Sequence, residues 1–121
     1  MKKIITLAGA ISFATLFAQP AGAISYQCTT ASYYGHGDGY ENGITASGER
    51  LRSDALSTAH RSLPFGTKLL VKNQANGRSV VVRVNDRGPF VAGRDLDLNY
   101  GAFAKIAPVS QGVAKVCYSI I

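Results

Sequence analysis

The chain contains few of the side chains that bind metals. Its 121 residues include two cysteines, Cys28 and Cys117, and two histidines. The sequence has no C-x-x-C motif and no cluster of histidine with cysteine, which argues against a structural zinc site. We therefore expect no metal and no other cofactor.

Long hydrophobic segments are also scarce. The longest apolar stretch, at 4–17, follows two lysines and is soon followed by A-G-A at 21–23. It is too short for a good membrane span. A basic start, an apolar middle and a small-residue end are typical of a secretory signal peptide. We predict a signal peptide at 1–23 and a single domain at 24–121 without a membrane span, the alternative being an uncleaved membrane anchor.

Acidic residues are outnumbered by basic ones. Without the two N-terminal lysines the chain keeps 11 basic and 7 acidic residues, a net charge of +4. A moderately basic exported domain suits an anionic polymer such as cell wall. Export argues against nucleic acid, the other common polyanion, and no recognition helix or aromatic-rich RNA motif is visible. We expect no nucleic-acid partner and a location in the periplasm or outside the cell.

The two cysteines are enough for one disulfide. An even number of cysteines in an exported protein favours a bond between Cys28 and Cys117. Such a bond would join the two ends of the domain and, by loop-closure entropy, stabilise the fold by about 4 to 5 kcal/mol. Two buried free thiols are the alternative.

Short strand-like segments alternate with turn signals along the rest of the chain. Strands are predicted at 29–34, 67–72, 80–84 and 112–119, with a Gly-rich loop at 35–43. An N-G pair at 76–77 indicates a hairpin. Asn99 can cap a short helix from Tyr100 to Ile106 that ends before Pro108. Many short strands with one short helix indicate a small β-barrel.

The segment at 78–90 combines an apolar strand with polar residues. Its β-branched run at 80–84 is expected to be buried on most of its faces, and it leads directly into N-D-R-G-P. The end of a rigid strand that presents a carboxylate and a guanidinium on a loop is a position where enzymes place chemistry. The alternative is an ordinary Gly-Pro turn in which Asp86 bonds to its own loop backbone.

Several motifs resemble those of one enzyme family. They are A-S-Y-Y-G at 31–35, T-A-S-G-E at 45–49, T-A-H-R-S-L-P-F-G-T at 58–67, N-G-R at 76–78, N-D-R-G-P-F at 85–90 and D-L at 97–98. In this order and spacing the chain resembles the rare lipoprotein A (RlpA-like) family of bacterial septal lytic transglycosylases, from about 31 to 116. The resemblance implies an all-β fold, a six-stranded double-psi β-barrel with one or two short helices.

Members of this family cut peptidoglycan glycan strands without using water. An acid protonates the oxygen between N-acetylmuramic acid and N-acetylglucosamine, and the muramyl 6-hydroxyl then closes on C1 to leave a 1,6-anhydro end. This chemistry needs one carboxyl group that acts first as an acid and then as a base. The resemblance implies an endolytic enzyme of this type, and we expect it to be a monomer.

The resemblance also assigns catalytic residues. Asp86 matches the family's catalytic aspartate, and Glu49 and His60 match its other two functional positions. His60 would orient the carboxylate or bind sugar hydroxyls, and Glu49 would hold His60 or the glycan. Alternatively, His60 is a core histidine with satisfied hydrogen bonds, and Glu49 is a solvated loop charge.

Four further residues are candidates for substrate binding: Tyr33, Tyr34, Arg87 and Asp97. Either tyrosine could stack on sugar rings, although strand alternation puts one of the two in the core. Asp97 resembles the aspartate of the expansins and of related glucanases with the same barrel, so it is the rival catalytic acid. Alternatively, it bonds backbone amides near the following helix. The loop at 35–43 carries H-G-D-G, which matches no motif of the family.

Two other functions remain open. A non-catalytic, expansin-like module would bind and loosen cell-wall glycans. A barwin-like or protease-binding module is the third class, and nothing in such a role requires Asp86, His60 and Glu49 together.

Overall fold

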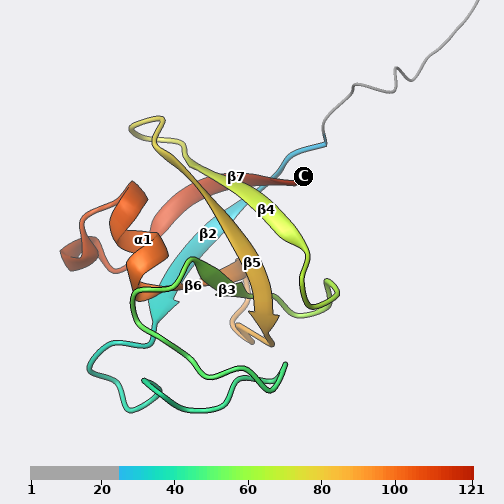
Figure 1. Ribbon diagram of the computed structural model, residues 1–121. Helices are drawn as coiled ribbons and strands as arrows, with labels where there is room; N and C mark the ends of the chain where they lie inside the picture. The colour runs from blue at the N-terminus through green and yellow to red at the C-terminus, as the bar shows by residue number, and fades with distance from the viewer. Residues whose placement is uncertain (1–24) are drawn as a thin grey trace, which may run out of the picture.

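Residues 25–121 form a closed β-barrel in the computed structural model, which describes this part of the chain (Figure 1). Its strands are β2 (Gln27–Tyr34), β3 (Ser57–Ala59), β4 (Lys68–Asn73), β5 (Ser79–Asp86), β6 (Arg94–Asn99) and β7 (Ala114–Ile120). They lie in the order β2-β6-β3-β5-β4-β7. β2 and β6 run parallel, as do β3 and β5, and the other neighbours are antiparallel. The predicted six-stranded barrel is confirmed, whereas the signal peptide predicted at 1–23 lies outside the described residues.

Four of these strands, β2, β4, β5 and β7, lie within two residues of the predicted ends. β3 and β6 are not among the predicted strands. β3 has three residues, too few for a periodic pattern to show. β6 reads R-D-L-D-L-N, in which Leu96 and Leu98 point into the core and alternate with aspartates. This period-two alternation was the available signal for β6.

The predicted helix is confirmed as α1 (Tyr100–Ile106). Asn99 caps its first turn, because the Asn99 Oδ1 accepts a hydrogen bond from the Gly101 N–H at 3.0 Å. Phe103 is fully buried and helps to pack α1 against β2, β5 and β6. A short 3-10 helix, η3 (Val109–Gln111), follows, so the structure contains the one or two short helices that were expected.

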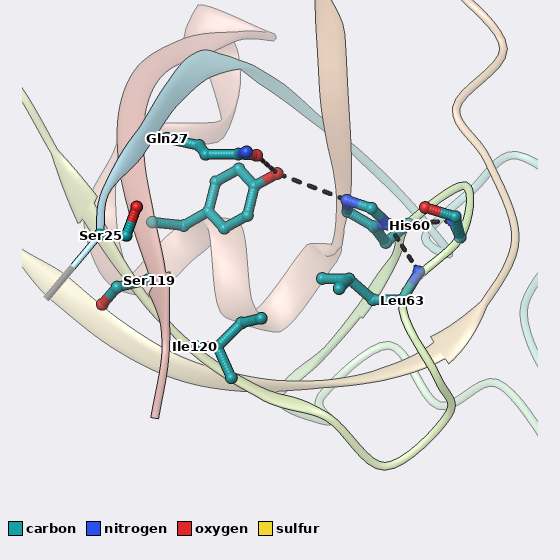
Figure 2. Close-up of a pocket in the computed structure, with 8 residues that line it drawn as sticks. Ser25, Gln27, His60, Leu63, Ser119 and Ile120 are labelled. Atoms are coloured by element: carbon teal, nitrogen blue, oxygen red, sulfur yellow. Dashed lines mark hydrogen bonds between the residues drawn. The ribbon is translucent and has the colours of Figure 1, made fainter.

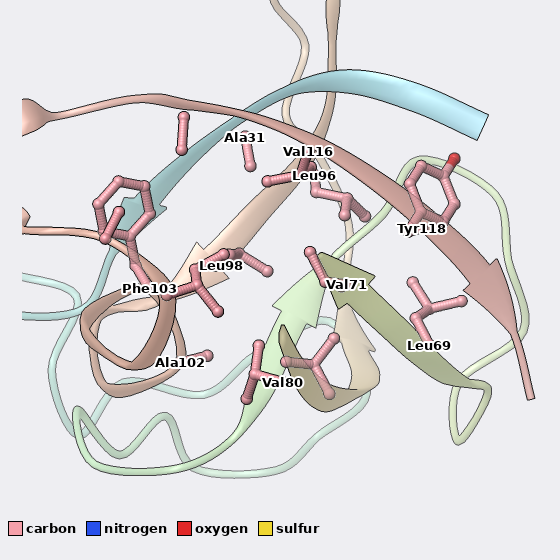
Figure 3. Packing of buried hydrophobic residues seen from close by; sticks show 14 of the residues in the cluster. Ala31, Leu69, Val71, Val80, Leu96, Leu98, Ala102, Phe103, Val116 and Tyr118 are labelled. Carbon is pink, nitrogen blue, oxygen red and sulfur yellow. The ribbon is translucent and has the colours of Figure 1, made fainter. Parts of the chain in front are cut away.

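The core lies inside the barrel and under α1 (Figure 3). Five of the strands and the helix contribute to it, and its largest fully buried members are Phe103, Leu69, Leu96, Leu98 and Ile106. In β5, alternate valines point inward, but Val81 is 42% exposed. The expectation that this strand is buried on most of its faces was therefore wrong, because only its inner face packs in the core. The outward-facing residues of β5 after Val81 are Arg83 and Asn85, which the loop at 45–49 contacts.

The predicted disulfide joins Cys28 and Cys117, which face each other in register on β2 and β7. The two residues are 89 positions apart, so the bond ties the first strand of the barrel to the last. Within residues 25–121, no helix is long and apolar enough to cross a membrane.

Candidate functional site

A row of paired residues crosses four neighbouring strands of the barrel. Ser32 on β2 pairs with Asp97 on β6, Asp97 pairs with Ala59 on β3, and Ala59 pairs with Asp86 on β5. Laterally paired residues present their side chains on the same face of a sheet. A register shift between Thr58 and Ala59 brings Asp86 into this row, where strict alternation along β5 would place Asn85. Since adjacent strands lie about 4.8 Å apart, the two aspartates are about 10 Å apart along this row. The barrel thus brings both candidate acids to one surface.

The carboxylate of Asp86 accepts three hydrogen bonds. The Tyr34 hydroxyl donates to Oδ2 at 2.7 Å, and the N–H groups of Ala46 and Arg87 donate to Oδ1, each at 2.9 Å. Burial raises the pKa of Tyr34, and the neighbouring Asp86 raises it further, so the hydroxyl keeps its proton and remains a donor. The bond from Arg87 is the local turn contact considered above, whereas Tyr34 and Ala46 come from distant parts of the chain. Asp86 is therefore held by tertiary contacts.

Glu49 forms an ion pair with Arg83 on the outer face of β5. Both guanidinium Nη atoms donate to the carboxylate at 2.8 Å, and Asn85 Nδ2 donates to Oε1 at 3.1 Å. The bonds from Arg83, and then the bond from Asn85, lower the pKa of Glu49. A charged carboxylate paired with a guanidinium is suited to fastening a loop.

The ion pair fastens the loop at 45–49 across the end of β5. The Ser47 N–H donates to the Asn85 carbonyl at 3.2 Å, and the Ala46 N–H reaches Asp86. Figure 1 shows the chain from 35 to about 56 running from the end of β2 below the end of β5. The attachment of Glu49 to Arg83 therefore fixes one of the donors to Asp86.

His60 lies just beyond β3 and its ring turns toward β7 (Figure 2). Nδ1 accepts hydrogen bonds from the N–H groups of Ser62 and Leu63, both at 3.0 Å. Nε2 lies 3.4 Å from the hydroxyl of Tyr118, which donates to Gln27 Oε1 at 2.7 Å. Burial lowers the pKa of His60. Because Nδ1 is an acceptor, the neutral ring carries its proton on Nε2.

His60 and Asp86 line different pockets. His60 lines a cavity of about 430 Å³ that has no lining residue in common with the pocket beside Asp86. Their backbones do meet, because the His60 N–H donates to the Asp86 carbonyl at 3.2 Å. Within residues 25–121, no hydrogen bond joins the side chains of Asp86, His60 and Glu49. The structure thus brings the three predicted residues to neighbouring positions without linking their side chains.

Asp97 has the properties of a second candidate acid. Its Oδ1 accepts a hydrogen bond from the Ser32 hydroxyl at 3.1 Å. Burial raises the pKa of Asp97 to about 6, although the bond from Ser32 opposes this rise. A carboxyl group with a pKa in this range can donate a proton near neutral pH. Ser32 is the Asp97 partner that the sequence motifs did not reveal.

The remaining predicted residues divide between the core and the site. The Tyr33 hydroxyl donates to the Val109 carbonyl at 3.0 Å and its ring packs against Phe103, so Tyr33 is the tyrosine that belongs to the core. Tyr34 faces Asp86. The guanidinium of Arg87 lies 4.0 Å from the ring centre of Phe65 and holds the turn after β3 by a bond to the His60 carbonyl. In the described part of the chain, no group of three or more His, Cys, Asp or Glu residues could hold a metal ion.

Sequence reasoning also did not identify the partners of Arg83 and Tyr34. Arg83 interrupts the run V-V-V-R-V, and a charge at an outer position of an apolar strand was a signal that it has a partner. The partner itself, Glu49, could not be deduced, because the loop that carries it is placed by tertiary contacts.

A protein family described as lytic transglycolase matches residues 26–118. The chain belongs to this family of double-psi β-barrels. The resemblance inferred from the motifs at 45–49, 58–67 and 85–90 is thereby confirmed.

Bacterial relatives in this family carry matching names. A Nostoc protein named "probable endolytic peptidoglycan transglycosylase RlpA" is 53% identical over 75% of this chain and 24% of its own length. A Synechocystis protein of the same name is 52% identical over 75% of this chain and 28% of its own length. The endolytic peptidoglycan transglycosylase RlpA of Campylobacter jejuni is 45% identical over 75% of this chain and 32% of its own length. The chain thus spans about a quarter to a third of the length of these relatives.

Solved structures show the same fold at low identity. The Streptomyces papain inhibitor matches with a TM-score of 0.63 and 24% identity, over 84% of this chain and 97% of that one. The apo expansin of Clavibacter michiganensis matches with a TM-score of 0.65 and 22% identity, over 80% of this chain and 50% of that one. These likenesses concern the barrel fold alone.

The Glu49–Arg83 ion pair is expected to matter for activity more than for stability. In Arg83→Gln the loop at 45–49 loses its attachment, so the peptidoglycan cleavage that we propose below for this chain should slow on the order of tenfold to a hundredfold through misplacement of the Asp86 donors. Because both side chains are about two-fifths exposed, the free energy of unfolding should change by about 1 kcal/mol or less. Cleavage rates and urea unfolding of both proteins measure the two effects.

Arg78→Gln is the matched control, because Arg78 is exposed at the start of the same segment. The charge swap that combines Glu49→Arg with Arg83→Glu should restore part of the activity if the pair only fastens the loop. A swap that leaves cleavage at the level of the single variants would show that Glu49 itself takes part in the chemistry.

The raised pKa of Asp97 predicts a pH-dependent effect of Asp97→Asn on stability. Between the ordinary aspartate pKa of 3.8 and about 6, the folded chain binds more protons at Asp97 than the unfolded chain does. The contribution of Asp97 to the free energy of unfolding therefore falls as the pH rises through this window. In Asp97→Asn this pH-dependent loss of stability is absent. The free energy of unfolding of the variant, relative to that of the wild type, should therefore be higher at pH 7 than at pH 4.

Urea unfolding of both proteins at the two pH values measures this difference. Asp54→Asn, at a side chain that is 79% exposed, is the control and should show no such trend. An Asp97→Asn variant whose difference from the wild type is the same at both pH values would contradict the assigned environment of Asp97.

Proposed function

We propose that the chain is an exported lytic transglycosylase domain that cleaves peptidoglycan glycan strands internally and leaves 1,6-anhydro-muramyl ends. The observation that carries this proposal is the Asp86 carboxylate, held by three donors at the edge of an open pocket in a barrel of the lytic transglycolase family. The names of relatives at 45 to 53% identity support the same activity.

In this proposal Asp86 serves as the acid and then as the base. Its carboxyl proton passes to the oxygen that leaves C1 of the muramyl unit, and the C1–O bond breaks. The muramyl 6-hydroxyl forms a new bond to C1 and gives its proton to the Asp86 carboxylate, so no water is consumed. Tyr34 and the loop at 45–49 keep the carboxylate in place through both steps, since a misplaced group loses much of its effect.

The other site residues take supporting parts in the proposal. Glu49 fastens the loop through Arg83, and His60 holds the turn that carries the Arg87 contact. Arg87 steadies the turn after β3 through the His60 carbonyl, and Asp97 is the alternative acid. A direct catalytic role for His60 stays a prediction.

Export and location form part of the same proposal. A disulfide between the first and last strands suits an oxidising compartment, and the basic N-terminus followed by an apolar stretch suits a cleaved signal peptide. We therefore place the mature domain, from Ile24, in the bacterial envelope with peptidoglycan as its partner.

The products released from purified peptidoglycan in isotopically labelled water test the reaction class. A lytic transglycosylase gives 1,6-anhydro ends that contain no oxygen from the solvent. A hydrolase gives reducing ends that contain labelled oxygen. We expect anhydro ends without label, measured by mass spectrometry of the soluble fragments.

Two results would contradict the proposal. Labelled reducing ends would show hydrolysis. Binding to peptidoglycan without release of either product would show a wall-binding module of the expansin-like kind.

A further inference from the structure

The H-G-D-G motif folds the loop at 35–43 into a fixed shape. The Asp38 carboxylate accepts hydrogen bonds from the N–H of Gly35 at 2.8 Å and from the N–H of Tyr40 at 3.0 Å. Gly37 and Gly39 adopt φ values of 72° and 88°, which non-glycine residues rarely adopt. The aspartate and its flanking glycines thus close the loop on itself and determine where Tyr40 lies.

Contacts at both ends attach this loop to the rest of the molecule. The His36 ring stacks on Tyr100 at the start of α1, with ring centres 4.1 Å apart and planes inclined by 21°. At the other end, the Asn42 N–H donates to the Leu51 carbonyl at 2.8 Å and the Leu51 N–H donates to the Gly43 carbonyl at 2.7 Å. The loop is therefore fixed at both ends.

The loop places Tyr40 beside the proposed acid. The Tyr40 ring lies edge-on to Tyr34, with centres 6.2 Å apart, and the Tyr34 hydroxyl donates to Asp86. Tyr40, Ile44 and Leu51 contribute the apolar walls of a pocket of about 100 Å³ that Asp86 also lines. Tyr40 is 63% exposed and Ile44 is 64% exposed, so neither contributes much to the core. Large exposed apolar side chains that gather at a pocket beside a few polar groups are typical of a ligand contact.

The size and chemistry of the pocket restrict what it can hold. A pocket of about 100 Å³ is far smaller than the roughly 300 to 1,000 Å³ typical of whole small-molecule ligands, so it suits a single substituent. Its apolar walls suit a methyl group. The Tyr34 oxygen donates its proton to Asp86 and keeps lone pairs that can accept an N–H.

We propose that this pocket binds the 2-acetamido group of the sugar next to the cleaved bond. The acetyl methyl packs against Tyr40 and Ile44, and the amide N–H donates to the Tyr34 hydroxyl oxygen. This inference rests on the proposed function, because both sugars of peptidoglycan carry a 2-acetamido group. On this proposal Tyr40 determines the preference for sugars that carry a 2-acetamido group, and it stands in a loop that lies outside the family motifs.

Affinity for two matched oligosaccharides tests the pocket. Chitohexaose carries a 2-acetamido group on each sugar and cellohexaose carries a 2-hydroxyl, while the β-1,4 backbone is the same. Burial of one methyl group corresponds to about a fourfold gain in affinity. The disulfide-bonded exported protein should therefore bind chitohexaose at least about fourfold more tightly than cellohexaose in an NMR or calorimetric titration.

Tyr40→Ala should abolish this preference and weaken chitohexaose binding by about tenfold, as loss of a contacting aromatic often does. Ile44→Ser should reduce the preference in the same direction. Tyr26→Ala is the matched control. Tyr26 is also exposed, at 53%, but it lies just before the start of β2, whereas the pocket lies at the other end of that strand. It should retain the wild-type preference.

Equal affinity of the wild type for the two sugars, or a preference that survives in Tyr40→Ala, would overturn the inference. Absence of chitohexaose binding would overturn it as well. Anhydro ends released from peptidoglycan by the same preparation separate this result from the proposed function. Release without any sugar preference refutes the acetamido pocket alone, and a Tyr40-dependent preference without release supports the pocket while refuting the cleavage reaction.

Discussion

The carboxylate of Asp86 is the point at which three parts of the chain meet. Tyr34 donates to it from the end of β2, Ala46 from the loop at 45–49, and Arg87 from the turn after β5. β2 and β5 are not neighbours, since β6 and β3 lie between them in the barrel. The bond from Tyr34 therefore spans the site and depends on the closed, curved shape of the sheet. A group that gives up a proton and takes one back must keep its position through both steps.

The two loops next to this carboxylate have different roles. The loop at 45–49 is fastened by the Glu49–Arg83 pair and supplies a backbone donor. The loop at 35–43 is folded by Asp38 and presents an exposed aromatic ring at the pocket. The two loops are also joined to each other, because Leu51, just after the loop at 45–49, forms backbone hydrogen bonds with Asn42 and Gly43.

Local patterns were enough to predict α1 and four of the six strands, because a cap at Asn99 and alternating apolar residues act over a few positions. They also indicated that Asp86 lies at the end of an apolar strand, where it is found. The direction of the His60 ring could not be predicted, because it depends on N–H donors from the turn that follows and on Tyr118 from β7. The partner of Glu49 was likewise hidden, since Arg83 lies 34 positions away and only the folded barrel brings the two together.

The central claim is that Asp86, rather than Asp97 in the same row of the barrel, is the acid. Initial rates of anhydro-end formation by Asp86→Asn and Asp97→Asn, on the same peptidoglycan, test this claim most directly. Removal of a general acid typically lowers the rate by about 10² to 10⁴, so Asp86→Asn should lose at least about a hundredfold. Asp97→Asn should stay within about tenfold of the wild type, since on this account Asp97 transfers no proton. A folded Asp97→Asn variant without activity, together with an active Asp86→Asn variant, would contradict the account.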